Sequence, residues 1–381
     1  MFDLRDKTAI CGVGASRQGK IDGSSAISLA VEAFRNALDD CGLKKSDIDG
    51  LLTMPGTTSP EGAKHYLHLG EVLGLNPRYT GSKFLGGGTA GALVQEAALA
   101  VSTGLATYVA CVFGDAAKTG NSRFGGSYGW GDSWGIWGMF SACANSAVSA
   151  SRHMALYGTT SRQLGEVASA CRYHASLNPH ALMRKTFSVD DHQNSRWIVE
   201  PLHLLDCCLI SDGGVCVIVT TPERARALRK PAVPILGMGQ AHSTQMLELP
   251  EWWYVPHQKV AADAAYRMAG IGPKDIDVAQ LYDNFSMSIL LWLEHAGFCK
   301  RGESGPFVEG GRIRLGGELP VNTAGGNLSE SYMEGWLHIV EGVRQMRGEC
   351  GERQVAGAEV CLVTGRGMTL NCSNALILRK D

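Results

Sequence analysis

The strongest constraint on the fold is an internal repeat of a strand, a helix and a second strand. Residues 7–14, KTAICGVG, are typical of a buried strand. A helical pattern follows and ends at Gly42, and KKSDIDGLLTM then predicts a turn and a second strand. Residues 232–285 repeat this order. The repeat predicts a duplicated α/β fold with largely parallel sheets. One offset relates Ala33, Ala37, Gly42, Asp47, Ile48 and Asp49 to Ala261, Ala265, Gly270, Asp275, Ile276 and Asp277.

The repeat also divides the chain into two halves. We expect an N-terminal half over residues 1–229 and a C-terminal half over residues 230–381, with the junction at KPAVP. Residues 116–205, rich in Trp, His and Arg, are predicted to form a loop domain inserted into the first half. Duplicated α/β halves place their site between them, where strands end and helices begin.

Charge and composition argue against several classes of protein. A formal net charge of -2 gives no sign of a nucleic-acid surface. The opening stretch MFDLRDKTAICGVG has no signal-peptide pattern, and no apolar run is long enough to cross a bilayer. The 12 cysteines include no C-x-x-C pair, which argues against structural zinc and is typical of reduced thiols. We therefore expect a cytoplasmic protein without a metal site.

A glycine-rich stretch, SKFLGGGTAGALVQEAALA (residues 82–100), runs into a helical pattern without an obvious chemical group. It has no Lys for a phosphate beyond the one at its start, no Ser in a G-x-S-x-G frame and no Cys. A helix N-terminus still has unpaired N–H groups and the positive end of the helix dipole. These can hold a thioester carbonyl or an enolate oxygen. We therefore predict that Gly87 and Gly88 lie close to a bound thioester.

Segments along the whole chain resemble the thiolase superfamily, in its sterol-carrier-protein or lipid-transfer-protein branch. They include YGTTSRQLGEVASACRYHASLNPHALMRK, EPLHLLDCCLISDGGVCVIVTT and the ending CLVTGRGMTLNCSNALIL. The resemblance implies a thiolase fold, in which two duplicated βαβαβ-type halves form a layered α/β/α/β/α core with a loop domain in the first half. It also implies a homodimer core.

Four positions depart from the thiolase pattern. A thiolase carries a nucleophilic Cys in a C-x-x-G frame, and Gly88 stands there in this chain. Tyr282, in Y-D-N-F, replaces the His of H-[DE]-x-F, and Tyr332 replaces the His that follows the N-x-x-G-G loop. Val363 replaces the Cys of the last C-x-G-x-G. Without a thiolate, covalent acyl transfer is not expected.

Two phenols in place of two histidines suit a retro-aldol cleavage. One phenol takes the proton of a β-hydroxyl, the carbon–carbon bond breaks, and the other phenol reprotonates the thioester enolate. Tyr282 and Tyr332 are therefore the predicted catalytic residues, and which is the base and which the acid stays open. The supporting residues are Asp283, Asn284 and Asn322, and the thioester-binding backbone is expected at Gly87, Gly88, Gly325, Gly326 and Gly367.

The Y-D-x-F motif and the tyrosine in S-E-x-Y-x-x-G resemble the thiolase-like aldolases of steroid side-chain degradation. The resemblance implies cleavage of a tertiary β-hydroxyacyl-CoA, such as a 17-hydroxy steroid side-chain CoA, to a ketone and a short acyl-CoA. It implies a small partner with an OB-fold and a zinc ribbon, in a heterotetramer, and no cofactor beyond the CoA of the substrate. Glu334 stands where that group often has His. Its effect, the acyl or steroid group, and any catalytic residue from the partner stay open.

Two other functions are compatible with the sequence. A thiolase or acyltransferase with a displaced nucleophile needs a Cys near Gly88, and none is in frame, since Cys361 comes two positions early. A non-enzymatic acyl-CoA or sterol-binding protein would not need Tyr282 or Tyr332. The aromatic stretches at residues 124–140 and 251–256 are predicted either to pack at a subunit interface or to form a wall for a flat substrate.

Overall fold

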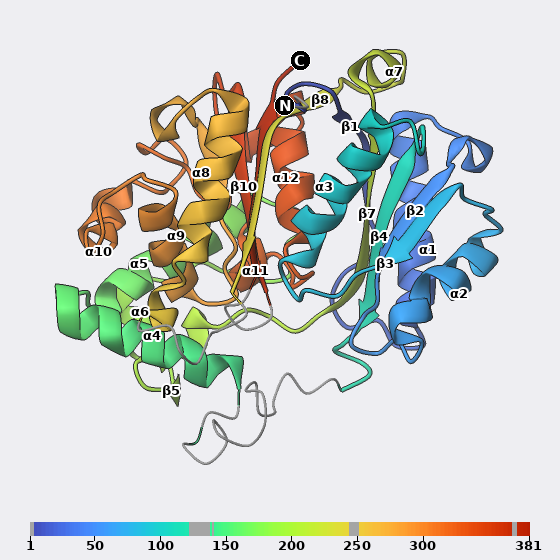
Figure 1. Cartoon of the computed structure of the whole chain (residues 1–381). Helices are drawn as coiled ribbons and strands as arrows, with labels where there is room; N and C mark the ends of the chain where they lie inside the picture. The colour runs from blue at the N-terminus through green and yellow to red at the C-terminus, as the bar shows by residue number, and fades with distance from the viewer. Residues whose placement is uncertain (1–3, 122–137, 139–140, 244–250, 368–371) are drawn as a thin grey trace.

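The computed structural model describes residues 4–121, 138, 141–243, 251–367 and 372–381. Within these ranges, nine strands form one sheet in the order β3-β2-β4-β7-β1-β8-β11-β10-β9 (Figure 1). Strands β5 (Trp197–Val199) and β6 (Leu202–His203) form a separate antiparallel pair. The nine strands are β1 (Ala9–Ala15), β2 (Gly50–Met54), β3 (Tyr79–Ser82), β4 (Val109–Ala116), β7 (Asp212–Thr220), β8 (Val233–His242), β9 (Val278–Gln280), β10 (Val360–Gly367) and β11 (Cys372–Arg379).

Helices cover both faces of this sheet and also lie between its two halves (Figure 1). No helix within the described ranges is long and apolar enough to cross a membrane. The helices are α1 (Ala26–Cys41), α2 (His65–Leu73), α3 (Thr89–Ser102), α4 (Ala142–Tyr157), α5 (Ser161–Ser176), α6 (Val189–Gln193), α7 (Pro222–Arg226), α8 (His257–Ala269), α9 (Ser286–His295), α10 (Ser304–Phe307), α11 (Gly326–Ser329) and α12 (Trp336–Arg347).

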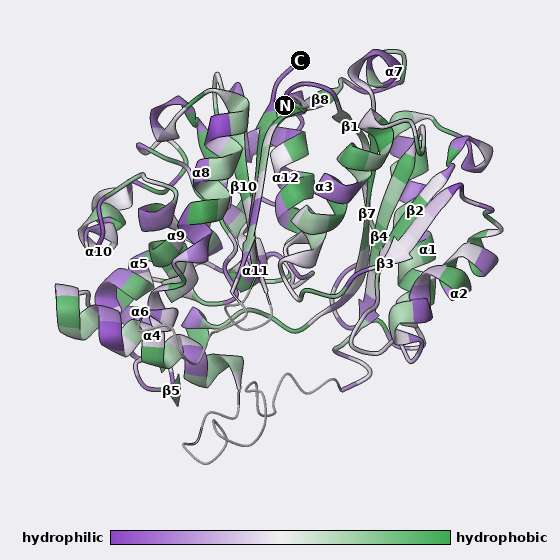
Figure 2. Ribbon diagram, in the orientation of Figure 1, coloured by the Kyte–Doolittle hydropathy of each residue, from purple (hydrophilic) through white to green (hydrophobic). Residues whose placement is uncertain are grey.

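The core has the layered α/β/α/β/α arrangement expected of the thiolase fold. Helices α3 and α12 form the central layer, and their buried side chains share one apolar cluster with strands from both halves. Helices α1 and α2 cover the outer face of the first half, and α8 and α9 cover that of the second. In Figure 2 the central helix α3 is largely hydrophobic, as a helix buried between two sheets must be.

The two copies of the sequence repeat fold alike. Ser25 caps α1 through a capping box, and α1 ends at Gly42 with a left-handed backbone. Helix α8 ends in the same way at Gly270. A Cβ at Gly14 of β1 would overlap the α1 backbone, and one at Gly239 of β8 would overlap the α8 backbone. Glycine on the strand therefore allows the closest packing of strand and helix in both copies.

The repeated D-I-D sequence has a structural cause in hydrogen bonding. Asp47 and Asp275 each accept a bond of 2.8 Å from the N–H that opens the short 3₁₀ turn before the strand. Asp49 and Asp277 each accept two N–H groups at the start of the neighbouring strand, β4 in the first copy and β10 in the second. The two carboxylates thus join each βα unit to the next strand of its half.

The sheet is mixed, so the expectation of largely parallel strands was wrong. Strand β2 is parallel to β3 and β4, and β9 is parallel to β10. The pairs β1–β7, β4–β7, β8–β11 and β10–β11 are antiparallel, and β1 and β8 join the halves antiparallel over two residue pairs. The repeat unit does run parallel from β1 to β2 and from β8 to β9. Strands β7 and β11, which lie outside the repeat, insert antiparallel within each half.

The region between β4 and β7 contains helices α4, α5 and α6 and packs on the second half of the molecule. Its apolar side chains share a cluster with those of α8 and α9. Two polar side chains from this region bind the segment that follows β9 and α10: Arg172 Nε donates to Ser329 Oγ (2.9 Å), and Asn178 Nδ2 donates to Ala324 O (3.0 Å). The inserted region therefore fixes the loop that leads to Tyr332.

Candidate active site

Two tyrosines from distant parts of the chain meet between the halves. Tyr282 follows β9, is only 2% exposed, and donates its backbone N–H to Thr364 Oγ1 of β10 (3.0 Å). Tyr332 follows α11 and is partly exposed. The two phenol oxygens lie 3.1 Å apart, within hydrogen-bond distance. The fold thus brings together the two tyrosines that the sequence motifs indicate.

Glycines make room for the Tyr282 ring. A Cβ at Gly87, just before α3, would overlap this ring, and one at Gly335 would lie 3.2 Å from it. A Cβ at Gly367 of β10 would overlap the carbonyl of Leu85. The absence of side chains at these three positions lets the glycine-rich loop contact both the phenol and the strand.

The N-terminus of α3 offers different donors from those expected. The N–H groups of Gly88 and Thr89 donate to carbonyls of the preceding turn, at 3.2 and 2.8 Å. The Gly88 N–H, expected to hold the thioester, is therefore already engaged in this conformation. Within the described part of the chain, the N–H groups of Ala90 and Gly91 donate to no backbone carbonyl. They are the unpaired donors of the first helical turn.

Asp283 connects the two tyrosine-bearing segments. It is fully buried, and its carboxylate accepts the N–H of Asn327 in α11 (2.9 Å). His338 Nε2 lies 2.9 Å from the same oxygen, in an ion-pair geometry. The imidazole ring of His338 in turn lies beside the Tyr282 ring, with centroids 6.3 Å apart. Asp283 therefore positions the site rather than facing a substrate.

Asn322, like Asp283, has a structural role in the site. Its backbone is left-handed (φ +53°), its Oδ1 accepts the N–H of Leu281 (2.7 Å), and its Nδ2 donates to Leu281 O (2.8 Å). Gly325 and Gly326 also have positive φ, and a Cβ at Gly326 would overlap the carboxylate of Asp283. These glycines shape the turn that leads to Tyr332.

Burial raises the pKa of Tyr282 and of Tyr332 well above the usual value, and the negative charge of Glu334 adds to both effects. Glu334 is 7% exposed, and its interaction with the side chain of Tyr332 favours the charged carboxylate. Burial raises the pKa of Glu334 from 4.5 to about 7, and the charge of Asp115 acts in the same direction. Perturbed groups that converge in this way are typical of catalytic sites.

Arg366 is the residue of the site that the sequence reasoning missed. It is 4% exposed, and Nη2 donates to Asn284 Oδ1 (3.3 Å). Burial lowers the pKa of Arg366 to about 10, and the nearby Tyr282 and Tyr332 oppose this effect. Among the described residues no carboxylate pairs with it. Its place between two glycines of the last G-x-G was the only signal in the sequence.

Cys372 lies closer to the α3 N-terminus than the sequence suggested. A Cβ at Gly88 would be 2.8 Å from Cys372 Sγ, so a thiol does lie near the position of the missing nucleophile. Burial raises the pKa of Cys372 to about 12, which leaves the thiol protonated and a poor nucleophile near neutrality. Cys361 is fully buried in β10, and burial also raises its pKa.

The structure describes only one of the two aromatic stretches, residues 251–256, in full. Apart from Gly138, residues 124–140 lie among those for which the structure describes nothing. Trp253 and Tyr254 are buried against α4 and α9, and Tyr254 Oη donates to Glu294 Oε2 (2.7 Å). The guanidinium of Arg301 lies over the Tyr254 ring. This second stretch is therefore part of the core of the chain and forms no wall at the tyrosines.

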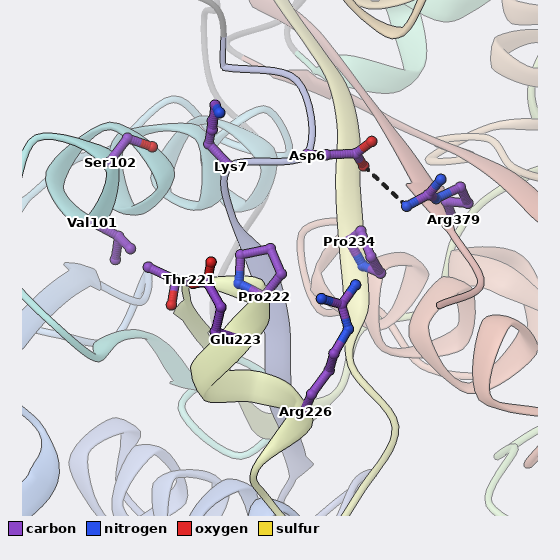
Figure 3. Close-up of a pocket in the computed structure, with 10 residues that line it drawn as sticks. All are labelled: Asp6, Lys7, Val101, Ser102, Thr221, Pro222, Glu223, Arg226, Pro234 and Arg379. Atoms are coloured by element: carbon purple, nitrogen blue, oxygen red, sulfur yellow. Dashed lines mark ion pairs between the residues drawn. The ribbon is translucent and has the colours of Figure 1, made fainter.

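A surface hollow of about 690 Å³ lies at the opposite ends of α3 and of the strands (Figure 3). It is lined by the chain before β1, the end of α3 and the start of α7. Asp6 and Arg379, two of the residues that line it, form an ion pair at 3.4 Å (Figure 3). A small gap lined by Gly87, Gly91 and Gly335 has no room for a water molecule.

A fold with a central helix N-terminus, two contacting phenols and no thiolate defines a thiolase-like protein without the thiolase nucleophile. Comparisons with known proteins agree. Residues 239–380 match the family model described as thiolase C-terminal domain-like. A steroid side-chain-cleaving aldolase of Thermomonospora curvata is 37% identical over the full length of both chains. The 17-hydroxy-3-oxo-4-pregnene-20-carboxyl-CoA lyase of Mycobacterium tuberculosis is 40% identical, over 95% of this chain and 96% of that protein.

A solved structure described as the Ltp2-ChsH2(DUF35) aldolase superposes with a TM-score of 0.92 at 38% identity, over 100% of this chain and 99% of that one. The chain belongs to the thiolase superfamily, in the group of thiolase-like aldolases that contains these relatives. It is an enzyme of the carbon–carbon lyase class, as the sequence predicted. The rival interpretations, a displaced thiolase nucleophile and a non-enzymatic binding protein, are not supported.

Proposed function

We propose that this enzyme cleaves the side chain of a 17-hydroxy steroid CoA thioester by a retro-aldol reaction. The observation that carries the proposal is the pair of phenols in hydrogen-bond contact beside the N-terminus of α3. The M. tuberculosis relative is named for a 17-hydroxy pregnene carboxyl-CoA substrate, and its identity of 40% extends over nearly all of this chain.

The reaction needs only the movement of one proton. A phenol oxygen accepts the proton of the tertiary hydroxyl and passes its own proton on, and the O–H electron pair forms the new carbonyl. The bond between the α- and β-carbons breaks, and its electron pair becomes the thioester enolate. A second phenol then delivers a proton to the α-carbon. The products are a ketosteroid and a short acyl-CoA, and no water or electron is consumed.

The developing enolate needs positive potential. The first-turn N–H groups of α3 and the buried charge of Arg366 supply it. Asp283, Asn284 and Asn322 position the loops around the phenols. We propose no cofactor beyond the CoA of the substrate, since acid, base and anion-stabilising groups all come from the chain.

We further propose a homodimer that pairs with a small partner protein. Strand β3 is one of the two outer strands of the sheet, and no described segment pairs with its free edge, so a second copy can continue the sheet there. The name of the Ltp2-ChsH2(DUF35) aldolase includes a second component, which supports the expected OB-fold and zinc-ribbon partner. All 12 cysteines are free thiols, which supports a reducing, cytoplasmic setting.

The test is incubation of the enzyme, with and without an OB-fold/zinc-ribbon partner from a neighbouring gene, with a 17-hydroxy steroid side-chain CoA thioester. Mass spectrometry would detect the ketosteroid and the short acyl-CoA. We expect cleavage, and loss of at least about 100-fold in kcat for Tyr282→Phe and Tyr332→Phe. Tight binding of the thioester without cleavage, with the partner present, would contradict the proposal and favour a binding protein.

A further inference from the structure

The proposed reaction leaves open which tyrosine accepts the hydroxyl proton and where that proton goes. Glu334 lies two residues after Tyr332 and is more than nine-tenths buried. Its carboxylate and the phenol of Tyr332 influence each other's pKa, and this phenol lies 3.1 Å from the phenol of Tyr282. The three side chains therefore form one electrostatically coupled cluster, in which the two phenols are in direct contact.

We propose that Glu334 is the proton acceptor behind Tyr332, so that Tyr332 is the base that takes the hydroxyl proton and Tyr282 is the acid that reprotonates the enolate. This inference rests on the proposed retro-aldol function and assigns roles within it. Glu334 acts through Tyr332 and is a positioning and proton-accepting group that does not itself touch the substrate.

Exposure separates the two tyrosines. Tyr332 is partly exposed, whereas Tyr282 is 2% exposed and lies between Gly87, Gly335 and the His338 ring. A substrate hydroxyl entering from the surface meets Tyr332 first. The Tyr282 phenol lies against the loop that leads into α3, where the enolate would be held.

The backbone at Glu334 supports a specific role for this carboxylate. Its φ is +49°, a left-handed conformation that is uncommon and strained for a non-glycine residue, and strain of this kind clusters at functional sites. The next residue, Gly335, is also left-handed. This turn holds the carboxylate behind Tyr332 and brings Gly335 against the Tyr282 ring.

The proton path balances over one turnover. The hydroxyl proton moves to Tyr332 Oη as the Tyr332 proton moves to the Glu334 carboxylate, and the carbon–carbon bond breaks. Tyr282 then gives its proton to the α-carbon and regains one from Tyr332, which recovers the proton held by Glu334. The enzyme returns to its starting state, and the substrate has moved one proton from oxygen to carbon.

The surroundings give Glu334 a suitable basicity. The titratable groups that interact electrostatically with it are the phenols of Tyr332 and Tyr282, the thiol of Cys208 and the carboxylate of Asp115. Asp115 accepts four hydrogen bonds from Thr57 and Thr58, so its oxygens are occupied. Burial raises the pKa of Glu334 to about 7, close to the optimum for a base that works near neutrality.

The experiment compares Glu334→Gln, which keeps a hydrogen-bonding side chain of the same size but accepts no proton, with Glu334→Asp. Glu330→Gln is the matched control, because Glu330 is buried in the same segment but bonds Asn178 and no tyrosine. We expect Glu334→Gln to lower kcat about 100-fold, Glu334→Asp to recover part of the loss, and Glu330→Gln to keep wild-type kcat.

The pH profile and a spectroscopic titration separate proton transfer from mere structural support. Wild-type kcat should fall below about pH 7 as Glu334 becomes protonated, and this acidic limb should disappear in Glu334→Gln. NMR of isotope-labelled tyrosine, assigned with Tyr332→Phe, should show Tyr332 ionising at lower pH in Glu334→Gln, because the opposing negative charge is gone.

Each outcome decides a different statement. Cleavage by the wild type with unchanged kcat and an unchanged acidic limb in Glu334→Gln would overturn the role of Glu334 and leave the retro-aldol function intact. Absence of cleavage by the wild type with its partner would overturn the function. In that case the tyrosine titration still tests whether the charge of Glu334 acts on Tyr332. Identical Tyr332 titrations in the wild type and in Glu334→Gln would overturn this interaction.

Discussion

Replacing Gly87 by Ala tests whether the position of the Tyr282 phenol matters for catalysis. The added Cβ would overlap the phenol, so the ring would have to move by about 1 Å or more to restore ordinary contact. A displacement of this size in a catalytic site costs on the order of 100-fold in rate. Overpacking of a buried site also costs about 1–3 kcal/mol of unfolding free energy.

The assay is steady-state kcat and KM together with a thermal or urea unfolding curve. We expect Gly87→Ala to remain folded and to lose about 100-fold in kcat. Gly70→Ala is the control: Gly70 lies inside α2, its Cβ would meet Leu51 at an ordinary 3.5 Å, and Ala there should stabilise the helix by about 0.5–1 kcal/mol without changing kcat.

A double variant shows whether the loss acts through the phenol. If Gly87→Ala works by displacing Tyr282, then Gly87→Ala combined with Tyr282→Phe should be little slower than Tyr282→Phe alone, because the two changes remove the same interaction. Full additivity of the two losses, or a folded Gly87→Ala variant with wild-type kcat, would refute the reasoning.

Three other changes follow from the structure. Arg366→Met should lower kcat about 100-fold. Its melting temperature should stay the same or rise, because a buried charge without a described carboxylate partner costs stability. A lower melting temperature with full activity would contradict this expectation. Asn322→Ala should lower the free energy of unfolding in urea by about 2–4 kcal/mol, since the backbone N–H and carbonyl of Leu281 both lose their partner. Asn322→Gly should cost less, because glycine tolerates the positive φ at this position. Hydrogen bonds from His153, Ser304 and Tyr254 overcome the effect of burial and lower the pKa of Glu294 from 4.5 to about 2. The stabilisation by the Glu294 carboxylate is therefore present above pH 4.5 and lost as the pH falls toward 2. In Glu294→Gln, the midpoint of urea unfolding should depend less on pH over that range.

The fold was largely predictable because its elements carry local signals. Gly42 and Gly270 end helices through a backbone conformation that glycine favours, and this requirement is visible in the chain itself. The order and direction of the strands were not predictable in the same way. Strands β7 and β11 pair with segments far away in sequence, and nothing local distinguishes a strand that inserts antiparallel from one that does not.

The site was predicted in part. Motif frames indicated Tyr282 and Tyr332, and the fold brings their hydroxyls to 3.1 Å. The frames could not show that the charge of Glu334 acts on Tyr332, or that Arg366 is buried and interacts electrostatically with both phenols. Those facts depend on burial and on contacts across the two halves.

The sequence alone determined the duplicated α/β plan, the absence of a nucleophile at Gly88 and the two phenols that replace histidines, because each is a matter of residue identity and spacing. Only the tertiary structure decided the mixed direction of the sheet, the engaged N–H of Gly88 and the buried thiol of Cys372 beside it. The physical reason is that desolvation and hydrogen bonding are set by neighbours distant in sequence. The same thiol or carboxylate is reactive, basic or inert according to what the fold packs around it.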